Sequence, residues 1–295
     1  MFSLYELLYL FKILDYYEPG LVGIIKYYIK SYTPQTYKIL KKLIELWCVY
    51  DFDIRMKCLN KYGNISFWDV SQITDMSILF KNKEYFNSDI SRWDVSNVCN
   101  MKGMFFNTSK FNQPLDSWDV SSVMSMEYMF TNAIMFNQPL NNWNTSTVFN
   151  MDAMFTEAKY FNKPLNNWNT SCVINMRGMF NGATCFNQPL NCWDVSNVIS
   201  MKFMFFDAVN FNQPLNNWIL KNIYHMYYMF NNEEKWNINL NKKLLTQWYK
   251  YKLNQPDSFN YLKKYTDLYY TYNNTNNDGF ICGYEYDRML LHSNY

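Results

Sequence analysis

Seven tryptophans recur at intervals of 25 residues through the middle of this 295-residue chain: Trp68, Trp93, Trp118, Trp143, Trp168, Trp193 and Trp218. Methionine keeps the same period from Met76 to Met226, and phenylalanine keeps it from Phe80 to Phe230. A fixed period of this length is typical of stacked repeats, in which each unit buries its apolar face only against its neighbours. The period therefore predicts the architecture and directs the search for function towards binding.

The clearest repeat unit is FNQPLNNWNTSTVFNMDAMFTEAKY, residues 136–160. Its segment 140–145 has the alternation of a short strand, and Met151, Met154 and Phe155 have helical spacing. Proline recurs in the repeats, as at Pro139, and has no backbone N–H to donate to a ladder of hydrogen bonds. It therefore belongs in the connection that leads into the strand. We therefore expect an α/β repeat solenoid of strand–turn–helix units.

Stacking such units at about 4.8 Å per coil would align equivalent side chains into columns. The tryptophan, the leucine and the Met-Phe pair of each repeat are expected to form buried columns. One asparagine per repeat is expected to form a polar ladder whose amides satisfy backbone groups of neighbouring coils: Asn112, Asn137, Asn162, Asn187 and Asn212. The site that alternates between aspartate and asparagine, such as Asp119 and Asn144, indicates hydrogen bonding rather than charge.

Three regions follow from where the period begins and ends. Residues 1–62 lack the repeat and are predicted to be a helical N-terminal cap, with an amphipathic helix around Ile39, Leu40, Leu43, Ile44 and Trp47. Residues 63–241 form the repeat array. Residues 242–295 break the period and are predicted to be a helical C-terminal cap, because an open stack exposes an apolar face at each end.

The repeat resembles the BspA-like repeat, also known as the DUF285 or PARCEL repeat, of bacterial surface proteins, protists and giant DNA viruses. The matching residues are FNQPLNNW at 136–143 and 211–218, WDVSNV at 93–98 and 193–198, and the Met-x-x-Met-Phe segment formed by Met126, Met129 and Phe130. The resemblance implies a leucine-rich-repeat-like, right-handed solenoid used for protein–protein interaction or adhesion, with no catalytic residues. The composition suits an AT-rich viral or protist genome.

The composition argues against several functional classes. Net charge is +2 and charged residues make up 18% of the chain, so the basic stripe of a nucleic-acid groove is missing. No apolar run is long enough to span a bilayer, and the N-terminus lacks the basic region and cleavage site of a signal peptide. We expect an intracellular monomer, in the host cytoplasm if viral, that needs no cofactor.

Periodic aromatic and hydroxyl residues raise two further functional readings. Aromatic rows can stack on sugars or single-stranded nucleic acid, but a stripe at structural period without interleaved basic residues is core. Repeated serines such as Ser121 and Ser146 have no histidine nearby in the pattern, so they are turn or cap hydroxyls rather than nucleophiles. The sequence therefore predicts a non-enzymatic protein–protein interaction scaffold.

Ligand contacts are expected at variable positions between the fixed ones. The residue after the first methionine of each repeat forms one such row of mixed charge, which an ordinary solvated face would also show: Lys102, Glu127, Asp152, Arg177 and Lys202.

The segment NTNNDGFICGYE, residues 274–285, resembles an EF-hand calcium loop. Its expected ligands are Asn274, Asn276, Asp278, the carbonyl of Phe280, and Glu285 as the bidentate carboxylate. Asparagine stands where the first aspartate is usual, which leaves two carboxylates, and no partner hand is visible; in an Asn-rich chain a turn can imitate this loop. The alternative function is therefore a calcium-binding adaptor or adhesin.

Overall fold

A computed structural model describes residues 31–226 and 228–230 of the chain. By spatial proximity the chain divides into two compact units, Met1–Leu244 and Leu245–Tyr295, and all described residues belong to the first. The expected C-terminal cap, residues 242–295, and the first half of the expected N-terminal cap lie outside the described residues.

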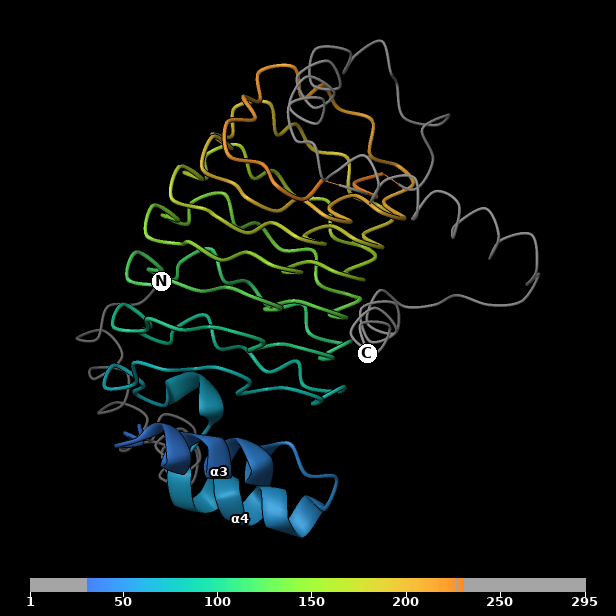
Figure 1. Ribbon diagram of the computed structural model, residues 1–295. Helices are drawn as coiled ribbons and strands as arrows, with labels where there is room; N and C mark the ends of the chain where they lie inside the picture. Colours follow the sequence, from blue (N-terminus) through green and yellow to red (C-terminus); the bar gives the residue numbers. More distant parts are fainter. Residues whose placement is uncertain (1–30, 227, 231–295) are drawn as a thin grey trace, which may run out of the picture. The chain divides into compact units, whose positions relative to one another are not determined.

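Two short helices precede the repeats (Figure 1): α3, Tyr37–Trp47, and α4, Phe52–Tyr62. Thr36 and Asp51 begin them by accepting hydrogen bonds from the backbone N–H groups of Ile39 and Ile54, which is normal N-capping. Helix α4 ends at Gly63, whose φ of 76° is easily reached only without a side chain. A 3₁₀ turn, η1, Ile65–Phe67, then leads into the first tryptophan.

Helix α3 covers the first coil of the array through its predicted apolar face. Leu40, Leu43 and Ile44 are buried, which confirms that part of the pattern. Trp47 donates from Nε1 to Ser88 Oγ at 3.1 Å, and its ring meets Trp68 at 5.9 Å between centroids. Ile39 is the exception to the predicted apolar face, since its side chain is 38% exposed.

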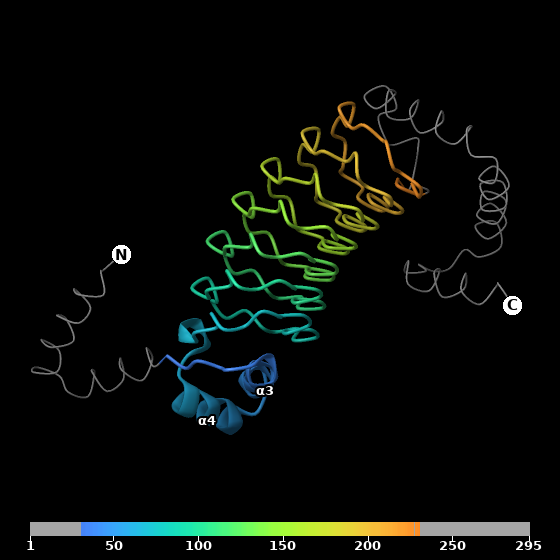
Figure 2. The ribbon, with the colours of Figure 1, turned by 60° about the vertical axis from the view of Figure 1, so that its left-hand side comes forward.

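The repeats form a parallel stack of coils (Figure 2), in which each backbone pairs with the equivalent backbone 25 residues further on. Single-residue parallel bridges join seven positions in order: Asp75, Asn100, Ser125, Asn150, Asn175, Ser200 and His225. Beyond the bridges, every second backbone N–H group also donates to the next coil. For example, the N–H of Gly103 donates to Glu127 O at 2.7 Å, and the N–H of Phe105 donates to Met129 O at 2.9 Å. Neighbouring coils are thus joined by backbone hydrogen bonds.

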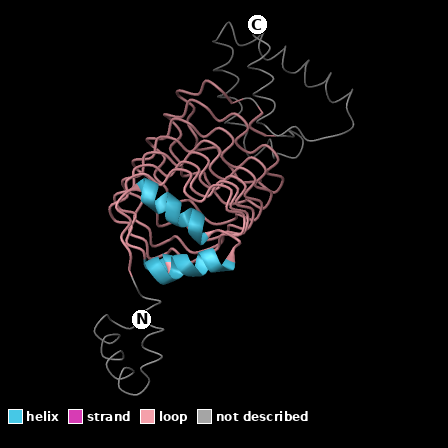
Figure 3. Ribbon diagram, turned by 90° about the horizontal axis from the view of Figure 1, so that it is seen from below, coloured by secondary structure: helices cyan, strands magenta, loops and turns pink. Residues whose placement is uncertain are grey.

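The helix expected in each repeat is not formed in the described array, which is a correction to the strand–turn–helix unit. Figure 3 shows α-helix only in α3 and α4 among the described residues. The third residue of each Met-x-x-Met segment has a φ between +51° and +58°, as at Tyr128 and Ala153. Left-handed residues cannot propagate a right-handed helix. Their backbone N–H groups instead donate to the next coil.

The expected strand at residues 140–145 is also absent, because the pairing between coils occurs later in the repeat, around Asn150. The wider assignment, a right-handed solenoid of leucine-rich-repeat type, stays a prediction. The 25-residue coil is nevertheless defined by its hydrogen bonds.

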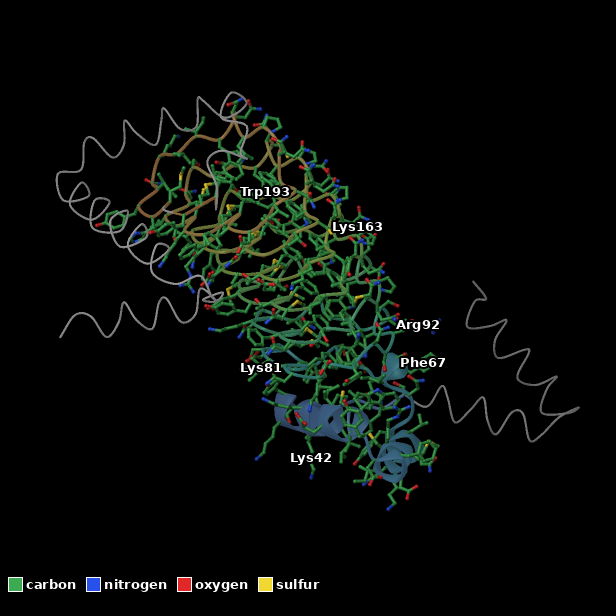
Figure 4. The ribbon with its side chains drawn as sticks, turned by 90° about the vertical axis from the view of Figure 1, so that its right-hand side faces the viewer. Lys42, Phe67, Lys81, Arg92, Lys163 and Trp193 are labelled. Atoms are coloured by element: carbon green, nitrogen blue, oxygen red, sulfur yellow. The ribbon has the colours of Figure 1, made fainter. Side chains whose placement is uncertain are left out.

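The interior consists of the predicted columns. All seven periodic tryptophans are buried, and Trp143 and Trp168 stack with ring planes 3° apart. Trp143 Nε1 donates to the carbonyl of Leu115 in the preceding coil at 2.9 Å, and the same bond recurs at Trp168. Figure 4 shows Trp193 inside the stack and Lys163 at its edge. The tryptophans are therefore structural, as the sequence indicated.

The predicted asparagine ladder is confirmed. The Oδ1 atom of each ladder asparagine accepts a hydrogen bond from the backbone N–H of the next, as between Asn137 and Asn162 at 3.0 Å and between Asn162 and Asn187 at 3.0 Å. Glutamine side chains reinforce it, and Gln188 Nε2 lies 2.9 Å from Asn162 Oδ1. The ladder satisfies backbone donors where the coils are not paired backbone to backbone.

Candidate interaction surface

The predicted charged row is largely engaged within the stack. Lys102 Nζ lies 2.9 Å from Glu127 Oε2, and Arg177 Nε lies 3.1 Å from Asp152 Oδ1. Asp152 and Lys202 are buried, at 5% and 6% exposure, so two of the five positions do not have the exposure that the sequence pattern suggested. The structure brings the row together, but as contacts between consecutive coils.

Asp152 is the centre of this polar cluster. Tyr128 donates its hydroxyl to Asp152 Oδ2 at 3.3 Å, and Arg177 Nη2 donates to the Tyr128 oxygen at 3.1 Å. Burial raises the pKa of the Asp152 carboxyl, while the positive charge of Arg177 and its hydrogen bond act in the opposite direction. Tyr128, Asp152 and Arg177 lie in three consecutive repeats, so their hydrogen bonds connect three coils.

The site that alternates between aspartate and asparagine forms a hydrogen-bonded turn, as predicted, in the six repeats from Asp69 to Asp194. The Oδ1 atom accepts from the backbone N–H two residues later, at Asp119 from Ser121 and at Asn144 from Ser146. The side-chain and backbone groups of Ser121 lower the pKa of Asp119, and Ser196 does the same for Asp194. A neutral amide makes the equivalent backbone bond at Asn144, so charge is not required.

Replacing Asp119 with asparagine is expected to preserve stability at neutral pH and reduce sensitivity to acid. The depressed folded-state pKa means that the carboxylate contributes stability above the ordinary value of 3.8, and that this contribution is lost as pH falls through the folded-state pKa. Thermal melts at pH 7 and about pH 3 measure the effect. Asn144→Asp is the matched reverse change and should add acid sensitivity; equal acid responses of wild type and Asp119→Asn would contradict the assignment.

A second row, which the sequence reasoning missed, is exposed and apolar. It occupies the position immediately before the bridging residue in five consecutive repeats, and its side chains are between 40% and 59% exposed: Met124, Phe149, Ile174, Ile199 and Tyr224. We call these five residues the apolar column. Their recurrence at the 25-residue period is visible in the sequence, but the period alone does not distinguish an exposed apolar column from a buried one.

Backbone pairing holds the apolar column in register. The N–H of Phe149 donates to Met124 O at 3.0 Å, that of Ile174 to Phe149 O at 2.9 Å, and that of Ile199 to Ile174 O at 2.8 Å. The side chains are therefore presented from consecutive rungs of one parallel ladder, about 4.8 Å apart. Cys99, half-buried, continues the column at its N-terminal end.

Polar rows border the apolar column on both sides, and beside its five residues they contain no aspartate, glutamate, lysine or arginine. One is the row of bridging residues, where Asn150 Oδ1 accepts from Asp152 N at 3.0 Å. The other lies two residues before the column: Asn97, Ser122, Thr147, Cys172, Asn197 and Asn222. In this row, Asn97 Nδ2 donates to Ser71 O at 3.0 Å, and Asn197 Nδ2 donates to Ser171 O at 2.8 Å. The apolar column with these borders suits a partner that is apolar and locally uncharged.

The calcium ligands expected at Asn274, Asn276, Asp278, Phe280 and Glu285 lie outside the described residues. Within residues 31–226 and 228–230, no cluster of three or more histidine, cysteine or acidic side chains is placed to hold a metal ion. In the same part of the chain, no helix has the length and apolar character needed to cross a membrane.

The sequence matches the family described as Mycoplasma protein of unknown function, DUF285, over residues 52–166 and 136–248. The chain belongs to this family. The two matched stretches overlap and together cover well over half of the 295 residues, including α4 and every described repeat. No curated protein and no solved structure matches this DUF285 protein.

Proposed function

We propose that this DUF285 protein is a non-enzymatic scaffold for protein–protein interaction. The observation that carries the proposal is the apolar column: Phe149, Ile174 and Ile199 stand 40–45% exposed on a ladder of backbone hydrogen bonds. A contiguous apolar patch on a solvent-exposed face typically marks a binding site, whereas single exposed apolar residues are common on protein surfaces.

The contrast between invariant buried columns and a variable exposed column supports this proposal. Tryptophan, methionine and phenylalanine are fixed from repeat to repeat and buried, whereas the apolar column varies among methionine, phenylalanine, isoleucine and tyrosine. A repeat array of this kind keeps its scaffold constant and changes its exposed positions to suit a partner. The charged row adds ion pairs between coils rather than a separate ligand site.

Ile174→Glu is expected to abolish partner binding while changing stability by no more than about 0.5 kcal/mol, because Ile174 is exposed. The measurement is affinity purification with the full-length chain, followed by quantification of each retained protein. Tyr160→Glu is the matched control, since Tyr160 is also exposed but lies in another row. Retention of the same proteins by wild type and Ile174→Glu would refute the apolar column as the binding surface.

A further inference from the structure

We propose that the apolar column binds a second copy of this chain, arranged antiparallel about a twofold axis. The inference rests on the proposed function and specifies its partner, and it departs from the monomer expected from the sequence. A twofold interface uses the same patch on both subunits, so the patch must complement its own reversed order. Spacing and side-chain size each meet this requirement, and the rows that border the column are uncharged.

Spacing favours a second copy over an α-helix. A helix lying along the column advances about 5.4 Å per turn, whereas consecutive coils are about 4.8 Å apart, so over four steps the two differ by about 2.4 Å, half a coil. A second array has the same coil spacing by construction. All five side chains, from Met124 to Tyr224, can therefore meet side chains of the second copy at once.

Side-chain size is complementary in the antiparallel order. With the twofold axis between the coils of Phe149 and Ile174, each of these residues faces the other in the second copy. The next pair outward is Met124 with Ile199, and the last is Cys99 with Tyr224. Each pair joins a longer or aromatic side chain to a smaller one, which avoids both gaps and overlaps in the interface. A parallel arrangement would instead oppose Phe149 to Phe149.

The rows that border the apolar column are compatible with this register. An axis at right angles to the column places each row opposite its own row in reverse order. The bordering row from Asn97 to Asn222 is uncharged and opposes no like charges.

Analytical ultracentrifugation of the full-length chain over a concentration series tests the association. Wild type is expected to shift from monomer to dimer as concentration rises, and Ile174→Glu to weaken the dimer at least tenfold because the substitution enters the centre of the interface twice. Tyr160→Glu should leave the dissociation constant within twofold of wild type. Thermal melts of both variants verify that they are folded.

Disulfide trapping tests the register. Tyr224→Cys places a thiol opposite the native Cys99 of the second copy, and mild oxidation should link positions 99 and 224 between chains, as identified by peptide mapping. Ile199→Cys is the matched control, one coil out of register, and should give several-fold less linkage to Cys99. Equal linkage from both variants would overturn the antiparallel register.

A wild-type chain that stays monomeric throughout the concentration series would overturn the second copy as partner. If Ile174→Glu nevertheless abolished capture of a different protein, such as one presenting an amphipathic helix, the proposed scaffold function would stand and this inference alone would fail. If Ile174→Glu kept both the dimer and the captured proteins, the proposed scaffold function and the second copy as partner would both be refuted.

Discussion

Replacing Trp143 with alanine is expected to lower the free energy of unfolding by about 3–5 kcal/mol, the usual cost of truncating a large buried aromatic side chain. Trp143 is 2% exposed at the middle of the array, and its ring stacks on Trp168 at 6.3 Å between centroids and lies 6.4 Å from Phe130. Truncation would leave a cavity between two coils that close backbone pairing prevents from collapsing.

The indole N–H makes a second, smaller contribution to this stability. Trp143 Nε1 donates to Leu115 O at 2.9 Å, so the alanine variant also leaves a buried carbonyl without this donor. Trp143→Phe keeps most of the ring and loses the donor, and its cost should fall nearer 1–3 kcal/mol. Urea unfolding followed by the fluorescence of the remaining tryptophans measures both variants. A Trp143→Ala midpoint equal to that of wild type would place the tryptophan column outside the core.

Replacing Asn162 with alanine is expected to cost about 1–3 kcal/mol, although the residue is only half-buried and carries no charge. Asn162 Oδ1 accepts from the backbone N–H of Asn187 at 3.0 Å and from Gln188 Nε2 at 2.9 Å. Alanine removes both bonds and leaves a backbone donor unsatisfied between two coils. The loss is local, because the backbone N–H of Asn162 still donates to Asn137 Oδ1.

Asn162→Asp is the matched control because a carboxylate oxygen can accept both bonds. It should keep most of the stability at neutral pH, and urea unfolding of the two variants side by side makes the comparison. Destabilisation by aspartate as large as that by alanine would show that the shape or neutrality of the amide, rather than its acceptor oxygen, supports the ladder.

Burial of the repeating columns could be predicted from the sequence because stacking requires it. An apolar residue that recurs every 25 residues must have a like neighbour above and below, so tryptophan, methionine and phenylalanine could be assigned to the core without a structure. The asparagine ladder followed by the same reasoning, since its amide can bridge adjacent coils. Both were confirmed in detail at Trp143 and Asn162.

Local conformation could not be predicted in the same way. The Met-x-x-Met-Phe segment has helical spacing, yet Tyr128 and Ala153 take left-handed φ values, which isolated non-glycine residues avoid. Their N–H groups donate to Asp152 O at 2.8 Å and Arg177 O at 2.7 Å in the next coil. These bonds between coils override the local preference for helix, and they exist only once the coils are stacked.

By itself, the sequence determined the period, the identity of the buried columns and the hydrogen-bonding role of the asparagine and aspartate sites. Only the tertiary structure decided which periodic apolar residues face outward and how the charged row is paired. Phe149 and Phe155 are both periodic and apolar, yet one is 42% exposed and the other fully buried. The direction of a side chain depends on the backbone around it, and in this array the backbone is set by hydrogen bonds to coils 25 residues away.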